Sequence, residues 1–382
     1  MPRQRPTRFA LSTAVVLALF ACGVDSTEVR AQEATPTLPA TPTLPATPRD
    51  AVARSLALLE RAARNYPRHR DCFACHHQSF PLLVQVEGRR IGLRPDEPTR
   101  QAISRFTRDW FSQRQPELRA GQSIDGRAIT VAYGLWTLEM AEVDDPVTDA
   151  MVDYLLKVQR ADGAWEPEAL RPPAEESKAF VTALALRGLH RASRRKPGQD
   201  PPIHPASPQA VDRDASLARA AERAFDWLTA NAAAAIQHAS IDDQAGQLLS
   251  YVWRADRFPG DKAPLRSARM QAWTDRLASL QGDNGGWAQR AGMESDPYAT
   301  GLALWTLAES GFDVRSEPFR RGAEYLRARQ AADGSWHTRS RCEPFQPFFD
   351  NGDPYGRDQF LSLMATGWAA AALARFEDRR DD

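Results

Sequence analysis

Apolar residues recur with a helical period along almost the whole chain from about Arg49 onward. Runs of alternating β-branched residues, the signature of half-buried strands, are absent from the sequence. The pattern therefore predicts an all-α protein of about twelve helices. The folded part begins after residue 49, because the preceding segment has no such period.

Two kinds of predicted helix alternate along the chain. One kind is charged on one side and spans residues 50–65, 96–115, 147–159, 212–234, 266–280 and 318–330. The other kind is more apolar, is richer in small residues and spans 79–92, 127–142, 177–192, 242–254, 297–311 and 358–376. An amphipathic helix has an outward face, whereas a helix that is apolar all round is buried. The alternation predicts a closed double ring of outer and inner helices.

A short loop recurs between outer and inner helices. Its copies are Gln159-Arg-Ala-Asp-Gly-Ala-Trp165, Gln281-Gly-Asp-Asn-Gly-Gly-Trp287 and Gln330-Ala-Ala-Asp-Gly-Ser-Trp336, and a Leu stands four residues before each Gln. Gly suits a left-handed turn after a helix, Asp or Asn favours the turn, and Trp packs over the junction. We expect these loops to fasten the ring together and to do no chemistry.

The third copy continues upstream into a longer pattern, Arg321-Gly322-x-x-Tyr325-Leu326-x-x-x-Gln330-x-x-x-Gly334-x-Trp336. This pattern resembles the QW motif of the squalene-hopene cyclase superfamily, and the other two copies resemble its second half. The resemblance covers most of residues 120–376. It implies an (α/α)6 toroid like that of terpenoid cyclases and protein prenyltransferases. It says little about activity, since this fold carries cyclases, prenyltransferases and pure binding proteins.

The N-terminus is typical of an export signal. Arg3, Arg5 and Arg8 precede an apolar run from Phe9 to Val24 that is too short for a stable membrane span. Cleavage before Gln32 would release a periplasmic protein with no transmembrane span, whereas cleavage before Cys22 would leave a lipid-anchored one. Residues 32–49, with Thr-Pro-Thr-Leu-Pro-Ala repeated, predict an extended linker to a toroid domain at 50–380.

Charge and cysteine content narrow the function classes. Removing residues 1–31 takes four basic residues from 49 and two acidic residues from 49, which leaves 45 against 47. A nearly neutral chain has no net field to attract nucleic acid, so that class is excluded. Four cysteines are too few for a disulfide scaffold. Cys72 and Cys75, however, stand three residues apart.

Those two residues belong to Cys72-Phe-Ala-Cys75-His76, followed by His77 and Gln78. Cys-x-x-Cys-His is the pattern that attaches c-type haem: two thioethers hold the porphyrin, and His76 would bind the iron. Haem is attached in this way outside the cytoplasm, which agrees with the export signal. A zinc site using His76 or His77, a disulfide and a redox-active thiol pair stay open as alternatives. The segment also resembles the Cys-x-x-Cys-His-His-Gln element of secreted bacterial cyclase-like proteins.

The ring predicts where this motif lies. Every loop from an outer to an inner helix opens on the same face, so the motif at 72–76 should neighbour the Trp loops at one mouth. His337 and Met293 follow two of those loops and are the candidates for a sixth iron ligand, His337 first. The competing interpretation is that both are ordinary loop residues.

A second candidate site is Ser240-Ile-Asp242-Asp243-Gln-Ala. It resembles the Asp-x-Asp-Asp-Thr-Ala motif with which hopene cyclases protonate an alkene, and Asp242 would match the proton donor. Ser240 replaces the first Asp and Gln244 replaces the Thr, which weakens the match. Ordinary helix capping by Ser240, with two acidic residues in the first turn, explains the segment equally well.

The loop from His337 to Asp358 combines aromatic, basic and proline residues. It either covers a ligand cavity or packs across the end of the ring. Together these patterns predict an exported toroid with haem c at its mouth, serving electron transfer to a redox partner or oxidation of an apolar, isoprenoid-like molecule. A cyclase-like enzyme using Asp242, and a ring that binds a ligand or protein without chemistry, are the alternatives.

Overall fold

The computed structural model describes residues 47–143, 145–167, 171–193, 208–237, 240–254, 263–343 and 348–377. These residues belong to one compact unit, Thr41–Asp382. The predicted signal peptide, the lipid-anchor residue Cys22 and nearly all of the linker lie outside the described residues and stay predictions. The first helix begins at Pro48, two residues before the predicted start of the toroid domain.

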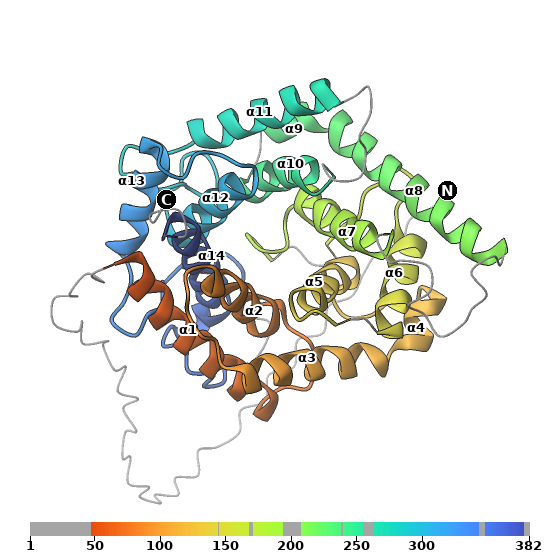
Figure 1. The fold of residues 1–382 in the computed structure, drawn as a ribbon, viewed down its shortest axis with the longest axis horizontal. Helices are drawn as coiled ribbons and strands as arrows, with labels where there is room; N and C mark the ends of the chain where they lie inside the picture. The colour runs from red at the N-terminus through yellow and green to blue at the C-terminus, as the bar shows by residue number, and fades with distance from the viewer. Residues whose placement is uncertain are drawn as a thin grey trace, which may run out of the picture. The chain divides into compact units, whose positions relative to one another are not determined.

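Six helices form an inner ring in the part of the chain that the structure describes. Each packs against the next in chain order, and the last packs against the first, which closes the ring (Figure 1). The inner helices are α2 (Cys75–Arg90), α5 (Arg127–Met140), α7 (Lys178–Ser193), α10 (Ile241–Arg254), α12 (Pro297–Glu309) and α14 (Gln359–Glu377).

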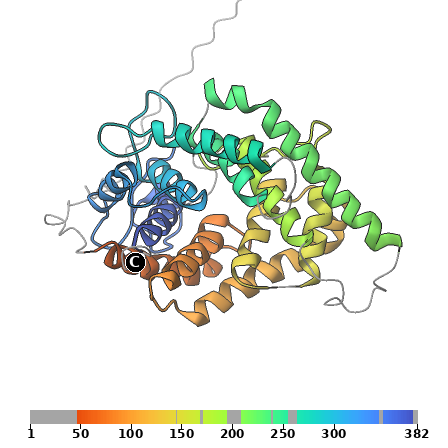
Figure 2. The same ribbon diagram turned by 45° about the horizontal axis from the view of Figure 1, so that its top comes forward.

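Each inner helix follows an outer helix that lies on the periphery in Figure 1, and α8 and α11 keep this peripheral place in the turned view of Figure 2. The described residues contain no strand, only two isolated bridges. The predicted all-α double ring is confirmed. The outer helices are α1 (Pro48–Asn65), α3 (Glu97–Ser112), α6 (Pro146–Val158), α8 (Pro208–Ala230), α11 (Ala263–Ser279) and α13 (Glu317–Arg327).

The observed bounds differ from the predicted ones at two informative places. The predicted outer helix 96–115 ends at Ser112, and a separate short helix, α4 (Gln115–Ala120), follows with Pro116 in its first turn. Backbone N–H groups in the first turn have no acceptor within the helix. Proline is therefore favoured there, because its missing N–H costs no hydrogen bond. A second short helix, α9 (Ala232–Gln237), was not predicted, and short 3-10 turns lie at Tyr66–Arg68 (η1) and Gly356–Asp358 (η2).

The Trp of each repeated loop is fully buried between an outer and an inner helix. The indole Nε1–H of Trp336 donates to the carbonyl of Leu326 at 2.8 Å, and its backbone N–H donates to Thr366 Oγ1 at 3.0 Å. Trp165 and Trp287 make the equivalent pairs of bonds. The Leu four residues before each Gln is therefore the acceptor that the Trp needs, and the loop ties its two helices together.

The Gln of the loop reaches the next outer helix. Gln330 Nε2 donates to the carbonyl of Ala51 at 2.8 Å, which joins the last helix pair to the first. Gly334 has a φ of +91°, and a Cβ there would lie 2.5 Å from the backbone of Arg54, so only glycine fits this crossing. These contacts confirm that the loops act as staples between helices.

Aromatic side chains fill the centre of the ring. Trp136, Trp305 and Trp368 come from α5, α12 and α14, and their ring centroids lie 5.0 to 6.0 Å apart. Phe80 and Phe180 pack against Trp368 from two further inner helices. Since all five are at most 3% exposed, the middle of the toroid is a packed core and not an open channel.

Among the described helices, none combines the length and the apolar character that crossing a bilayer demands.

Candidate functional site

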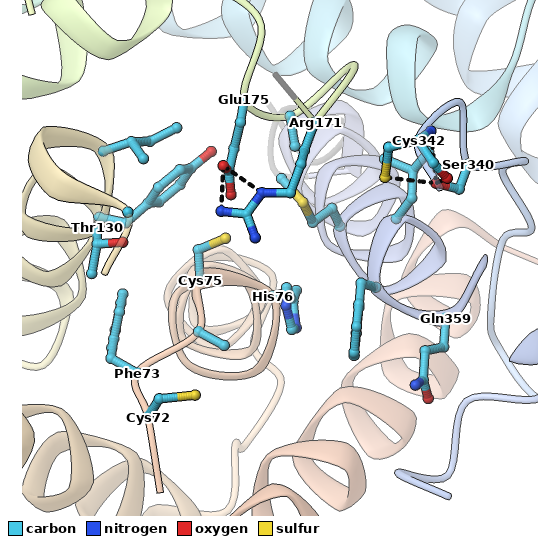
Figure 3. A pocket seen from close by; sticks show the side chains of 18 of the residues that line it. Cys72, Phe73, Cys75, His76, Thr130, Arg171, Glu175, Ser340, Cys342 and Gln359 are labelled. Atoms are coloured by element: carbon cyan, nitrogen blue, oxygen red, sulfur yellow. Dashed lines mark hydrogen bonds and ion pairs between the residues drawn. The ribbon is translucent and has the colours of Figure 1, made fainter. Parts of the chain in front are cut away.

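A cavity of about 480 Å³ lies at the end of the ring where the inner helices begin. Its walls come from the motif at 72–76, the start of α5, the loop at 171–175, and the chain from Ser340 into α14 (Figure 3). Aromatic side chains provide much of the surface: Tyr66, Phe73, Trp110, Tyr133, Phe348 and Phe360. A concave, largely apolar site with a few polar groups is typical of small-molecule binding.

The structure brings Cys72, Cys75 and His76 together on the wall of this cavity. We expected the motif to precede the inner helix at 79–92, but α2 begins at Cys75. Ala74 holds the extended backbone of an N-cap yet has no side chain to accept a bond, and Gln78 Oε1 instead accepts the Ala74 N–H at 2.7 Å. The Gln78 side chain thus folds back over the first turn of α2.

Both thiols of the motif are free and partly buried. Burial, with a smaller effect of Glu175, raises the pKa of Cys75 to about 12. The Tyr66 hydroxyl lies 3.2 Å from the Cys72 sulfur. The Cys75 thiol is therefore protonated at neutral pH, which speaks against a nucleophilic or redox-active thiolate at this position.

His76 is a neutral imidazole. Burial, followed by the nearby charge of Arg171, lowers its pKa to about 3. Its ring stacks on Phe360 with centroids 4.4 Å apart and an interplanar angle of 18°. Its Nδ1 lies 2.6 Å from Nδ1 of His77, so only Nε2 remains available to a ligand in the cavity.

One ion pair belongs to the cavity wall. Arg171 Nε donates to Glu175 at 2.7 Å, and Figure 3 shows this pair facing Cys75. Sequence reasoning missed the pair, because both residues lie in a polar stretch without a motif. It also missed Cys342 and Met364, which line the same cavity.

The two predicted sixth ligands are not part of the cavity. His337 follows its Trp loop as expected, but its Nε2 lies 2.9 Å from the Asp358 carboxylate, on a half-exposed side chain. Met293 is 39% exposed in the loop at 290–295. Met364 is 2% exposed and is the methionine that lines the cavity. Its neighbours in sequence are ordinary core residues, so no pattern singled it out.

The loop from His337 to Asp358 supplies part of the cavity wall through Ser340, Cys342 and Phe348. Residues 344–347, including the predicted Phe345, lie outside the described part of the chain. Arg341 turns away to Gln289, with Nε donating to Oε1 at 2.6 Å, and pairs with Glu176. The described residues of this loop therefore border a cavity, and the choice between a cover for a ligand and simple packing stays a prediction.

Asp242 and Asp243 begin α10 and have different environments. The Asp243 N–H donates to the Ser240 hydroxyl at 3.2 Å and the Asp243 carboxylate accepts the Ser240 N–H at 3.2 Å, which is the capping pattern, and Ser177 donates to the same carboxylate at 2.6 Å. Asp242 is 1% exposed and accepts a bond from the Tyr298 hydroxyl at 2.6 Å. Burial raises the pKa of Asp242 well above its usual range, although Tyr298 acts in the opposite direction. This shift favours the protonated form that a proton donor needs, but Asp242 does not line the cavity.

The raised pKa of Asp242 predicts how the stability of the folded chain depends on pH. Because its folded pKa lies above the usual 3.8, the folded chain binds an extra proton and loses stability as pH rises beyond that value. In Asp242→Asn this loss is absent, so the stability of the variant relative to wild type should increase as the pH rises from about 5 to about 8. Urea unfolding at both pH values measures the difference, and parallel stabilities would contradict the assignment.

A metal site needs several ligand side chains close together. Within the described residues, no three His, Cys, Asp or Glu side chains gather closely enough to hold a metal ion. A closed zinc site needs four ligands, so the zinc alternative lacks its further ligands around Cys72, Cys75 and His76.

Comparisons with known proteins define the fold. The chain matches no family model and no curated protein. It is similar to the structure of unsaturated glucuronyl hydrolase from Bacillus sp. GL1, with 12% identity, a TM-score of 0.52, and coverage of 87% of this chain and 96% of that one. A structure titled "Glycosidase Wild Type" gives 14% identity, a TM-score of 0.50 and coverage of 85% and 97%.

The fold is an α/α toroid. The ent-copalyl diphosphate synthase from Streptomyces platensis gives 17% identity, a TM-score of 0.40, and coverage of 85% of this chain and 50% of that one. At these identities the likenesses concern the fold alone. Evidence about the chemistry of this chain therefore has to come from the residues of the cavity.

Proposed function

We propose that this toroid carries a c-type haem in the cavity at its mouth, attached through Cys72 and Cys75, with His76 as an axial ligand. The observation that supports this most directly is that the three side chains of the Cys-x-x-Cys-His motif line one apolar cavity. Haem, when bound there, would supply one-electron chemistry at the iron. This proposal makes the toroid an electron-transfer or oxidising protein.

The residues fit the group in type and place. The cavity offers two thiols, each of which can add to a haem vinyl group: sulfur bonds to one vinyl carbon and the hydrogen goes to the other, so no oxidant is needed. His76 is neutral, lines the cavity and contacts His77 through Nδ1, which leaves Nε2 for a ligand. Phe73, Trp110 and Phe360 provide apolar walls that exclude water. Before Nε2 of His76 can bind iron, the proton of the neutral ring has to lie on Nδ1.

For the position opposite His76 we propose Met364 in place of His337 and Met293. Met364 is a buried thioether on the cavity wall, whereas the other two lie outside it. Thioether sulfur is an established axial ligand of c-type haem iron. Its assignment needs no rearrangement of the loops at 290–295 or 337–343.

Export remains part of the proposal. Covalent haem attachment takes place outside the cytoplasm, and the N-terminal signal with cleavage before Gln32, or before Cys22 as a lipoprotein, would deliver the chain to the periplasm. A redox partner protein and an apolar small molecule are the expected partners.

The test is expression of the full chain in a bacterium that has haem-attachment machinery. We expect the purified polypeptide to keep its Soret absorbance after denaturation and acid–acetone extraction, because thioethers survive both. Complete loss of the absorbance on extraction would overturn the proposal. The toroid would then be a ring that binds a ligand or protein without redox chemistry.

Acid catalysis on a polyprenyl chain is the second candidate, and the buried neutral Asp242 favours it. The aromatic core of the ring opposes it, because Trp136, Trp305 and Trp368 occupy the space that a long substrate would need. Incubation with squalene and shorter polyprenyls decides the matter. A cyclic product that Asp242→Asn abolishes would establish this activity, whereas no product from wild type would remove it.

A further inference from the structure

The amide of Asn351 has one orientation that satisfies its neighbours. Asn351 is completely buried in the loop before η2. Its Oδ1 accepts the backbone N–H of Asp353 at 2.8 Å, and its Nδ2 faces Nε2 of His77 at 2.9 Å. A turned amide would place its NH₂ group against the Asp353 N–H, donor against donor. The backbone therefore fixes Nδ2 toward His77.

This orientation dictates the protons of two histidines in sequence. An amide nitrogen only donates, so Nε2 of His77 must accept and the His77 proton must lie on Nδ1. That Nδ1–H then donates to Nδ1 of His76 at 2.6 Å. With Nδ1 of His76 acting as an acceptor, the proton of the neutral His76 ring lies on Nε2.

Apolar rings surround the hydrogen-bonded chain that runs from Asn351 through His77 to His76. His77 is completely buried, and the rings of Tyr66 and Phe349 pack on it with centroids 4.3 and 6.1 Å away. The stacked Phe360 ring offers His76 no hydrogen bond in the plane of the imidazole. The chain of contacts from Asp353 to His76 thus supplies the hydrogen bonds that set the tautomer.

We propose that Asn351, acting through His77, locks the ligand-free His76 in its Nε2–H form, which donates a hydrogen bond into the cavity and offers no lone pair to a metal. The inference builds on the proposed function, because the group that Nε2 would meet there is the haem iron. For iron to bind Nε2, the His76 proton has to leave that nitrogen, which disrupts the bonds that link His76, His77 and Asn351. Asn351 is therefore a positioning residue that weakens the bond between His76 and iron.

This assignment selects between the two roles left open for the haem. An iron held firmly by two ligands suits electron transfer, whereas an iron whose histidine is easily displaced has a position free for another molecule. The lock on His76 favours the second role, in which the haem meets a small molecule in the apolar cavity.

One isosteric substitution is expected to reverse the tautomer of His76. In Asn351→Asp, one carboxylate oxygen still accepts the Asp353 N–H, and the other can accept a proton from Nε2 of His77. The His77 Nδ1 then becomes the acceptor, the His76 proton moves to Nδ1, and Nε2 of His76 gains a free lone pair. Asn351→Ala removes the donor without adding an acceptor, and it serves as the second variant if the buried aspartate prevents folding.

Nitrogen-15 NMR of the haem-free, histidine-labelled full chain reads the tautomer directly, since a protonated ring nitrogen resonates far upfield of a bare one. A His76→Gln variant assigns the His76 signals, and circular dichroism confirms folding. We expect Nε2–H in wild type, Nδ1–H in Asn351→Asp, and a new Nδ1–H population in Asn351→Ala. Nδ1–H in wild type, or an unchanged tautomer in both variants, would overturn the proposal.

With haem bound, the same variants give a second readout. Free imidazole should displace His76 from ferric iron in wild type at concentrations about 10-fold lower than in Asn351→Asp, the scale on which partners of a ligand alter metal affinity. Equal concentrations would contradict the role toward iron. If no haem attaches at all, the proposed function fails while the tautomer experiment still stands, so the two failures are distinguishable.

Discussion

Replacing Trp336 by alanine is expected to lower the free energy of unfolding by about 3–5 kcal/mol. Trp336 has no exposed surface, and its indole N–H bonds to Leu326 while its backbone bonds to Thr366. The substitution leaves a cavity and removes the indole bond to the Leu326 carbonyl where α13 meets α14. The marginal stability of a domain, about 5–15 kcal/mol, makes such a loss a large fraction of the whole.

Urea unfolding of the folded chain measures this loss. Phe348→Ala is a suitable control, because Phe348 is 59% exposed and surface substitutions usually change stability by about 0.5 kcal/mol or less. Trp165→Ala and Trp287→Ala should behave like Trp336→Ala, since they repeat its contacts. A loss below about 1 kcal/mol at all three positions would refute the idea that these loops hold the ring together.

The second large effect concerns haem attachment. The double variant Cys72→Ser/Cys75→Ser is expected to lose all covalently bound haem, because serine hydroxyls do not form thioethers. Cys342→Ser is the matched control, since Cys342 is a partly buried thiol in the same cavity but lies outside the motif.

The measurement is the haem absorbance that stays with the polypeptide after extraction, with each variant expressed beside wild type. The control should keep its covalent haem. Haem retention in the double variant, or equal loss in Cys342→Ser, would show that the motif does not carry the attachment. Each single Cys variant should keep one thioether and therefore an intermediate yield.

The helices and their alternation could be predicted because they depend on periodicity that each segment carries by itself. The Trp loops could be assigned to the ring for the same reason, since their Gly, Asp and Trp act locally. The short helix α4 was missed because the predicted helix 96–115 stopped one residue before Pro116, which lies in the first turn of α4. The start of α2 was missed because Gln78, not the residue before the helix, provides the cap.

The cavity was predictable only in part. The ring placed Cys72, Cys75 and His76 at the mouth, because loops that connect outer to inner helices share one face. Met364 and Asn351 could not be found in this way. Each contributes through a contact with a segment far away in the sequence, as the bond between Asn351 and His77 shows. The aromatic core was equally hidden, since Trp136 and Trp305 look like ordinary apolar positions until their helices face one another across the ring.

The claim that this toroid is a haem protein is tested most directly by the intact mass of the full chain after expression with haem-attachment machinery. We predict that the denatured chain carries the added mass of one haem, and that peptide mapping places it on the segment containing Cys72 and Cys75. A chain whose mass equals that of the polypeptide alone, with both thiols free to alkylate, would contradict the account.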